Sequence, residues 1–172
     1  MPLESAQMLC SAHRAQDGEM VVGKSATGRK RTTYKHPNSN MDAVLYGAGW
    51  LKHPSCIWVM DSAYNYMWLY NHMMALGNEY TKRYGKTHLT ITKCKDFLAV
   101  PPANIQGDEF TQPPQAMPDI FKRACAIHAY WLYYVYDKKH IAHNKESLYD
   151  TEYIKSNFGY SDDLSCYTGT DG

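Results

Sequence analysis

The centre of the chain carries apolar side chains at the spacing of an α-helix. After Asp61 and Ser62, either of which can cap a helix start, they recur at alternating intervals of three and four residues. The positions are Tyr66, Leu69, Met73, Leu76 and Tyr80. Gly85 ends the pattern, and the cations gathered around it suit the negative end of a helix dipole. The spacing predicts a long helix over residues 61–84 with this seam buried.

A second stripe of side chains runs beside that seam, one position earlier. Its residues are Asn65, Trp68, His72, Ala75 and Glu79. A helix that had only to fold would more simply carry Lys and Glu there, so the aromatic and amide groups favour a surface that contacts a ligand. The alternative is that Trp and His only form the edge of the core. Periodicity does not separate these two interpretations.

Weaker patterns predict the other elements. Residues 2–15 are typical of a helix whose apolar side is Leu3, Ala6, Cys10 and His13. Residues 17–49 lack a period and are predicted to form a long loop. A short helix over 93–98, a loop over 104–118 and a final helix over 118–139 follow. The buried face of the final helix would be Phe121, Ala124, His128, Trp131 and Val135.

Strand-like alternation of useful length is missing, so we predict an all-α fold, a compact single-domain helical bundle with long loops. The helical domain would span residues 1–143 and include the loop 17–49. Residues 144–172 are polar and rich in Tyr, Ser and Asp, which predicts an irregular, loosely packed tail. Because the first helix begins almost at the first residue, we expect that an upstream segment is absent.

The long loop contains a cluster of cations among Ser, Thr and Tyr. Its cations are Lys24, Arg29, Lys30, Arg31 and Lys35. Such a cluster can neutralise several phosphates, so we expect a nucleic-acid contact here. The alternative is a solvated loop whose charges have no ligand. Arg83, Lys86 and His88, at the end of the long helix, are predicted to hold phosphates as well.

Composition limits the classes of function. The 172 residues suit one domain, and 44% hydrophobic with 20% charged residues is typical of globular proteins. The formal net charge of +1 excludes the strongly basic field of a pure nucleic-acid binder, so such a contact must be local. The five cysteines include no CxxC pair, and no signal peptide or transmembrane run is visible. We expect a cytoplasmic protein (host cytoplasm if viral) with reduced thiols and no membrane contact.

Common motifs for metals, cofactors and nucleophiles are missing from the sequence. His140 and His143 are an isolated pair, and there is no HExxH helix or Cys/His array. A nucleophile elbow, a phosphate loop and a dinucleotide fingerprint are likewise not found. We therefore predict neither a metal site nor a cofactor.

Several short motifs resemble a family of uncharacterised phage proteins. They are the run MPLESAQMLCSAHR at residues 1–14, His53-Pro54, Trp58, Asn65-Tyr66, Glu79-Tyr80, RYGKTH at 83–88 and QAMP at 115–118. More remotely, the predicted helical layout of the chain is similar to that of the phage pyrimidine-dimer DNA glycosylases of the endonuclease V type, which are small all-helical enzymes. That resemblance implies that Glu4 replaces their essential glutamate. It also implies that the terminal amine, on Pro2 if Met1 is removed, forms an imine with the sugar.

The sequence departs from both families in its first residues. The phage family has an upstream segment with Asp-Lys-His, which is missing here. Leu3 and Gln7 stand where the glycosylases have arginines beside the glutamate. These departures put the imine chemistry in doubt, although a terminal proline amine is chemically able to form an imine.

The resulting hypothesis is a phage-type DNA-processing protein, a base-excision glycosylase and lyase of DNA repair. Glu4 and Pro2 would be catalytic, with His72 or Glu79 as the second polar group. The rings of Tyr66, Trp68 and Tyr84 would stack on an unstacked base. The alternative is a non-catalytic binding protein or virion accessory protein. It would engage a protein partner, or a second copy of itself, through an aromatic groove between the stripe and the tyrosines of the final helix.

Overall fold

The computed structural model describes residues 2–138, which belong to two compact units, Met1–Thr111 and Gln112–Gly172. The predicted tail over 144–172 lies outside the described residues. In the first unit the elements are α1 (Pro2–Gln16), β1 (Glu19–Lys24), β2 (Lys30–Lys35), α2 (Ser39–Val44), α3 (Pro54–Asp61), α4 (Ala63–Tyr84) and α5 (Leu89–Cys94). In the second they are η1 (Asp119–Phe121), α6 (Ala126–Tyr133) and η2 (Tyr134–Lys138).

The long helix α4 forms where the sequence predicts it. The Ser62 side chain accepts a hydrogen bond from Tyr64 N at its start, and Gly85 ends it in the left-handed conformation with φ 66°. Gly is the residue that adopts this conformation without steric cost, which makes it the common end of a helix. Residues 54–61, directly before Ser62, form the separate helix α3.

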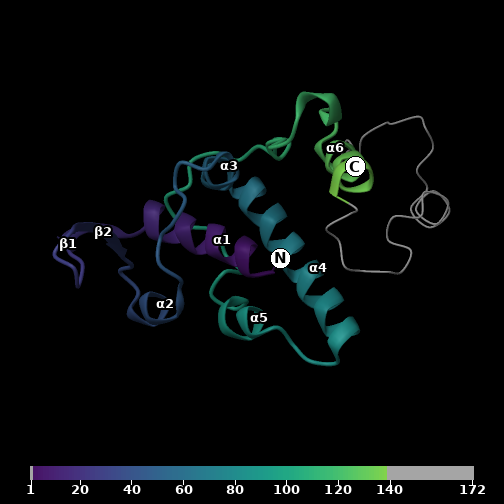
Figure 1. Cartoon of the computed structure of the whole chain (residues 1–172). Helices are drawn as coiled ribbons and strands as arrows, with labels where there is room; N and C mark the ends of the chain where they lie inside the picture. Colours follow the sequence, from purple (N-terminus) through teal and green to yellow (C-terminus); the bar gives the residue numbers. More distant parts are fainter. Residues whose placement is uncertain (1, 139–172) are drawn as a thin grey trace. The chain divides into compact units, whose positions relative to one another are not determined.

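The core of the first unit lies where α1 packs against α3, α4 and α5 (Figure 1). Its fully buried apolar side chains include Ala6, Leu9, Cys10, Ala12, Val59, Tyr66, Met73, Cys94 and Leu98. Gly77 lets α5 approach α4, because a Cβ there would lie 2.7 Å from Cγ1 of Ile91. The predicted seam is therefore buried at Tyr66, Leu69 and Met73, whereas Leu76 and Tyr80 are only half-buried.

The prediction of a structureless loop over 17–49 is wrong, and the predicted all-α fold class is confirmed only as a predominance of helices. The segment holds the antiparallel hairpin β1–β2, with register from Glu19↔Lys35 to Lys24↔Lys30, and the short helix α2. The hairpin extends from the C-terminal end of α1 (Figure 1). Eleven of its twelve strand residues are exposed and Tyr34 is half-buried, so neither face shows the apolar–polar alternation that marks a half-buried strand. The protein is helix-dominated with one small sheet.

Two further helix boundaries differ from the prediction. The short helix is α5, residues 89–94 rather than 93–98, because His88 Nδ1 accepts from Thr90 N and starts it earlier. The final helix is not continuous: residues 122–125 separate η1 from α6. Gln115 binds both the N–H and the carbonyl of Arg123, which holds that backbone out of a helix. Val135 is buried as predicted, but Ala124 is exposed.

Within residues 2–138, none of the helices combines the length and the apolar character that crossing a lipid bilayer requires.

Candidate functional site

Three polar side chains meet where the hairpin joins α1. His13 lies in the last turn of α1, Asp17 follows that helix, and His36 directly follows β2. One ligand atom from each, a ring nitrogen of either histidine and a carboxylate oxygen of Asp17, lies within 4.8 Å of the other two. His13 and His36 are 3% and 6% exposed, and their ring centroids are 5.8 Å apart. We call this group the His/Asp cluster.

The protonation of His13 follows from its partner on α4. Tyr66 donates its single hydroxyl proton to the Leu98 carbonyl at 3.1 Å. His13 Nε2, 3.0 Å from the same hydroxyl oxygen, must therefore be the donor in their contact. In the neutral ring this leaves Nδ1 without a proton, so its lone pair faces Asp17 Oδ2 at 3.9 Å.

Asp17 is held by the loop after α5. Its Oδ2 accepts from Ala103 N, and its Oδ1 accepts from the backbone N and the Nδ2 of Asn104, each at 3.0 Å. Gly18, the next residue, is required because a Cβ there would lie 2.3 Å from the Arg14 carbonyl oxygen. The carboxylate is therefore fixed in direction, and Oδ2 keeps a lone pair for a further partner.

Two buried nitrogens of the His/Asp cluster are unsatisfied. Among the described residues, neither His13 Nδ1 nor His36 Nε2 has a hydrogen-bond partner. The other nitrogen of His36, Nδ1, accepts from Asn38 N at 3.1 Å. Burial lowers the pKa of His13 to about 4, although the Asp17 carboxylate and the Val100 carbonyl act in the opposite direction. The ring is therefore neutral at pH 7, which leaves its lone pair free.

Arg14, the next residue along α1, is fully satisfied. Nε donates to the Tyr46 carbonyl at 2.6 Å, and the two terminal nitrogens donate to the carbonyls of Tyr34, Asp42 and Leu45 and to Asp42 Oδ1. All five guanidinium protons are thus used. Asp42 also accepts from His36 N, and these two hydrogen bonds lower the pKa of its carboxyl group. Arg14 therefore joins α1, β2 and α2.

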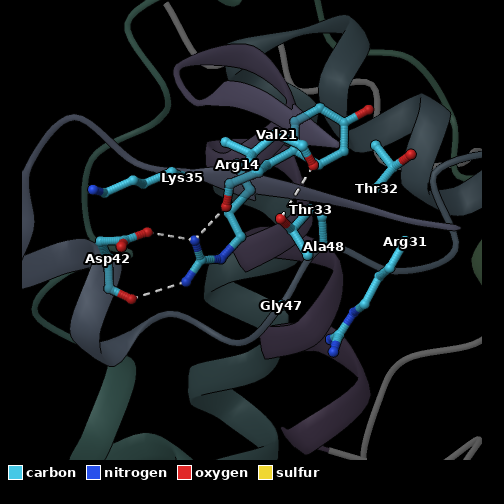
Figure 2. Close-up of a pocket in the computed structure, with 10 residues that line it drawn as sticks. Arg14, Val21, Arg31, Thr32, Thr33, Lys35, Asp42, Gly47 and Ala48 are labelled. Carbon is cyan, nitrogen blue, oxygen red and sulfur yellow. Dashed lines mark hydrogen bonds and ion pairs between the residues drawn. The ribbon is translucent and has the colours of Figure 1, made fainter. Parts of the chain in front are cut away.

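A pocket of about 400 Å³ opens beside Arg14, between the hairpin and the segment after α2. Arg31, Thr33 and Lys35 line it from β2, and Val21 lines it from β1. Figure 2 shows the Arg14 guanidinium turned to Asp42, with Lys35 and Arg31 on opposite sides of it. The charge of Arg14 is balanced by Asp42 at 2.7 Å, whereas in the described part of the chain Arg31 and Lys35 have no ion-pair partner. The pocket is therefore cationic.

The predicted phosphate contacts on the hairpin are all exposed. Lys24, Lys30, Arg31 and Lys35 lie on the strands, and Arg29 lies in the turn. Side chains of an antiparallel pair alternate between faces, so Lys24 and Lys30 share one face, while Arg31 and Lys35 share the other with the pocket. The hairpin thus presents cations on both faces.

The residues predicted to stack on a base or to act in catalysis near the start of α4 and α1 are either buried in the core or do not face one another. Asn65 and Tyr66 are fully buried, so Tyr66 has no ring face open to a base. Asn65 instead holds the Thr111 backbone and the Trp58 carbonyl. Pro2 is buried and Glu4 is exposed, and residues two apart on a helix do not face each other. This arrangement gives the imine hypothesis no geometric support.

The stripe on α4 and the corner after it are mostly exposed. The Trp68 ring is half-buried and stacks on the exposed His72, with centroids 5.5 Å apart. Glu79 is paired with Arg83 at 2.6 Å, one turn along the same helix, which lowers the pKa of Glu79. Tyr84 and Lys86 are exposed, and His88 caps α5. The predicted groove between α4 and the final helix would join the two units and stays a prediction.

Sequence reasoning missed three residues of interest. Asp17 lies one helical turn after His13, which is a weak signal because such spacings are common. His36 has no signal of its own, because it follows a strand that the sequence pattern does not predict. The third is Trp50, which is 69% exposed and has φ 59°. A bulky residue in the left-handed region is strained, and such strain persists where the surroundings enforce it.

No protein-family model matches this chain, and no curated protein or solved structure matches it either.

Proposed function

We propose that this protein binds DNA through the β1–β2 hairpin and the cationic pocket at its base. The observation that carries the proposal is the hairpin itself, which presents cations on both faces and packs almost none of its side chains into the protein. An isolated two-stranded hairpin is only marginally stable in water, so such an exposed ribbon is better explained by a partner that covers it.

The dimensions and charge of the hairpin suit a nucleic acid. The major groove of B-DNA admits a two-stranded β-ribbon, and cations on such a ribbon reach the phosphates on either side. The net charge of +1 shows that the protein has no general excess of positive charge. The local gathering of Lys and Arg on β2 and its turn is therefore the feature that supports a phosphate contact.

The pocket adds a second phosphate contact. Arg31 and Lys35 supply charge, and Thr33 lies between them on the same face of β2 and lines the pocket as well. Trp50 follows the pocket residue Ala48 by two positions and offers an exposed indole on which a base can stack. This residue replaces the buried Tyr66 as the stacking candidate.

The experiment measures the salt dependence of binding to a labelled duplex by fluorescence anisotropy. Wild type is compared with the triple variant Arg29→Gln, Lys30→Gln and Arg31→Gln. We expect weaker binding, and a slope of log K against log salt that is smaller by up to about three units, because each lost phosphate contact removes about one. The matched control removes three exposed lysines elsewhere, Lys52→Gln, Lys93→Gln and Lys95→Gln. Equal slopes in the hairpin variant and wild type would exclude the hairpin as the phosphate contact.

The finer hypothesis, a glycosylase and lyase that uses Glu4, has a separate test. Borohydride reduction in the presence of an abasic duplex would trap an imine as a covalent adduct, and Glu4→Gln should abolish catalytic turnover. An adduct would establish lyase chemistry. DNA binding without an adduct would leave a binding protein. A lack of any binding at low salt would favour the alternative, a protein that engages a protein partner or a second copy through aromatic side chains.

A further inference from the structure

We propose that the His/Asp cluster is a binding site for a divalent transition-metal ion, held by His13 Nδ1, Asp17 Oδ2 and His36 Nε2. The proposal is independent of DNA binding. It rests on three potential ligand atoms that lie within 4.8 Å of one another, in a region where both imidazoles are more than nine-tenths buried.

The two buried nitrogens without hydrogen-bond partners in the His/Asp cluster favour a bound cation. Leaving a buried polar atom without a partner is costly, and here two such atoms belong to the histidines whose ligand atoms lie within 4.8 Å of a carboxylate oxygen. A lone pair on His13 Nδ1 and an anionic oxygen at 3.9 Å do not satisfy each other, because both are acceptors. A cation between them satisfies both.

The surroundings of His13 and Asp17 are those of metal ligands. A ligating imidazole normally donates its other N–H to a neighbouring acceptor, and His13 donates Nε2–H to Tyr66, which is itself oriented by Leu98. A ligating carboxylate is normally held by further hydrogen bonds, and Asp17 accepts three. Both ligands are therefore oriented before an ion binds.

His36 must change one hydrogen bond to become a ligand. Its Nδ1 accepts from Asn38 N, so in the neutral ring the proton is on Nε2, the atom that would bind the ion. Coordination moves that proton to Nδ1 and breaks the contact with the backbone N–H of Asn38, an exposed residue that caps α2. A single neutral hydrogen bond contributes much less free energy than the coordination of a metal ion by several protein ligands. Coordination of the ion by His36 is therefore favoured over its hydrogen bond with Asn38.

The donor set selects the kind of ion. Two imidazoles and one carboxylate suit Zn²⁺ and other transition metals, whereas Mg²⁺ and Ca²⁺ prefer oxygen ligands. Zinc bonds of about 2.0–2.1 Å place neighbouring ligands roughly 3.4 Å apart, so the 3.9 Å between His13 Nδ1 and Asp17 Oδ2 needs only a small contraction.

The position of the ligands indicates what the ion would do. Asp17 comes just before β1 and His36 just after β2, so an ion would fasten both ends of the hairpin to the end of α1. Binding should therefore slow hydrogen exchange in the hairpin and raise the thermal midpoint of the protein.

The test uses the full chain without an affinity tag, freed of metal by chelator and titrated with Zn²⁺ by calorimetry. We expect one strong site in wild type and at least about a tenfold loss of affinity in His36→Gln and Asp17→Asn. The matched controls are His53→Gln, which removes a histidine whose Nδ1 accepts from the backbone N–H two residues ahead as that of His36 does, and Asp61→Asn; both should bind as wild type does. Circular dichroism verifies that each variant is folded.

Two results would overturn the proposal. One is the lack of a strong site in wild type, or equal affinity in wild type and in both ligand variants. The other comes from Co²⁺ as a spectroscopic probe: an intense near-ultraviolet thiolate band would place the ion on cysteines instead. Visible cobalt bands without the thiolate band, together with zinc-dependent protection of the hairpin that His36→Gln removes, would support it.

Discussion

His13 and Arg14 are neighbours on α1 and both are buried, but they differ in whether their polar atoms have hydrogen-bond partners. All five donors of Arg14 have acceptors, whereas His13 keeps one nitrogen unpaired beside a carboxylate and a second unpaired nitrogen. The first network is complete and joins elements. The second is incomplete, and its ligand atoms lie within 4.8 Å of one another. Satisfied polar groups in a core indicate a structural role, and unsatisfied ones that converge indicate a ligand.

The largest expected effect breaks the complete network. Arg14→Met should lower the free energy of unfolding by about 3–5 kcal/mol, because it leaves the Asp42 carboxylate and four backbone carbonyls without their donor. Urea unfolding followed by circular dichroism measures it. Arg14→Lys should recover only part, since an ammonium has three donors. A loss below about 1 kcal/mol would show that the network is not structural.

The next effect comes from pH and tests the incomplete network in metal-free protein. Because the folded state holds the pKa of His13 at about 4, below the ordinary 6.5, the unfolded chain binds a proton first as the pH falls. Stability should therefore be full above about pH 6.5 and fall by about 3 kcal/mol as the pH drops through 4. Urea midpoints at successive pH values measure the loss. His13→Gln, which can still donate to Tyr66, should show a shallower dependence; an identical one would contradict the assignment.

A smaller effect separates stability from ligand binding. Tyr66→Phe removes the hydroxyl between His13 and Leu98 and should cost about 1–3 kcal/mol, because two buried partners lose their hydrogen bond. If the His/Asp cluster holds an ion, the same change should also weaken Zn²⁺ binding by about 10–100-fold through the freed His13 ring. Tyr70→Phe is the control, since its hydroxyl bonds the Lys95 carbonyl away from the cluster. A stability loss with unchanged zinc affinity would remove Tyr66 from the site.

The smallest effect tests whether an exposed arginine behaves as Arg14 does. Arg83→Ala removes a pair with Glu79 on the surface of α4 and should change the free energy of unfolding by only about 0.3–0.5 kcal/mol. Thermal and urea midpoints close to wild type are expected. A cost comparable with that of Arg14→Met would mean that ion pairing, rather than completeness of the buried network, governs stability in this protein.

The sequence predicts the long helix because its signals are local. Ser62, the apolar seam and Gly85 lie within one segment, and each acts on its own neighbours in the chain. The hairpin is not predicted, because its strands bury almost no side chains. Residues 19–35 therefore lack the apolar–polar alternation that marks a half-buried strand. Local propensity is only a weak guide to such strands, since their neighbours decide them.

The candidate sites were predictable to different degrees. The cations of the hairpin are visible in the sequence because they are adjacent, although their division between two faces is not. His13 was expected to lie on the buried side of its helix, and it does. Its partner His36 lies on the far side of the hairpin in sequence, so no spacing rule connects the two without the fold. Tyr66 has two conflicting predictions from the sequence, a position in the buried seam and a ring that stacks on a base. Only the position in the seam is compatible with its full burial.

The hairpin has a consequence for the behaviour of the protein in solution. In the described part of the chain each of its strands has one backbone edge outside the ladder, and Met20, Val21 and Val22 are all exposed there. Open edges with apolar side chains invite pairing between molecules, and flanking lysines and arginines normally oppose it by repulsion. Added salt screens that repulsion within about 10 Å at 0.1 M. Concentrated stocks should therefore remain clear in dilute buffer and turn cloudy when salt is raised.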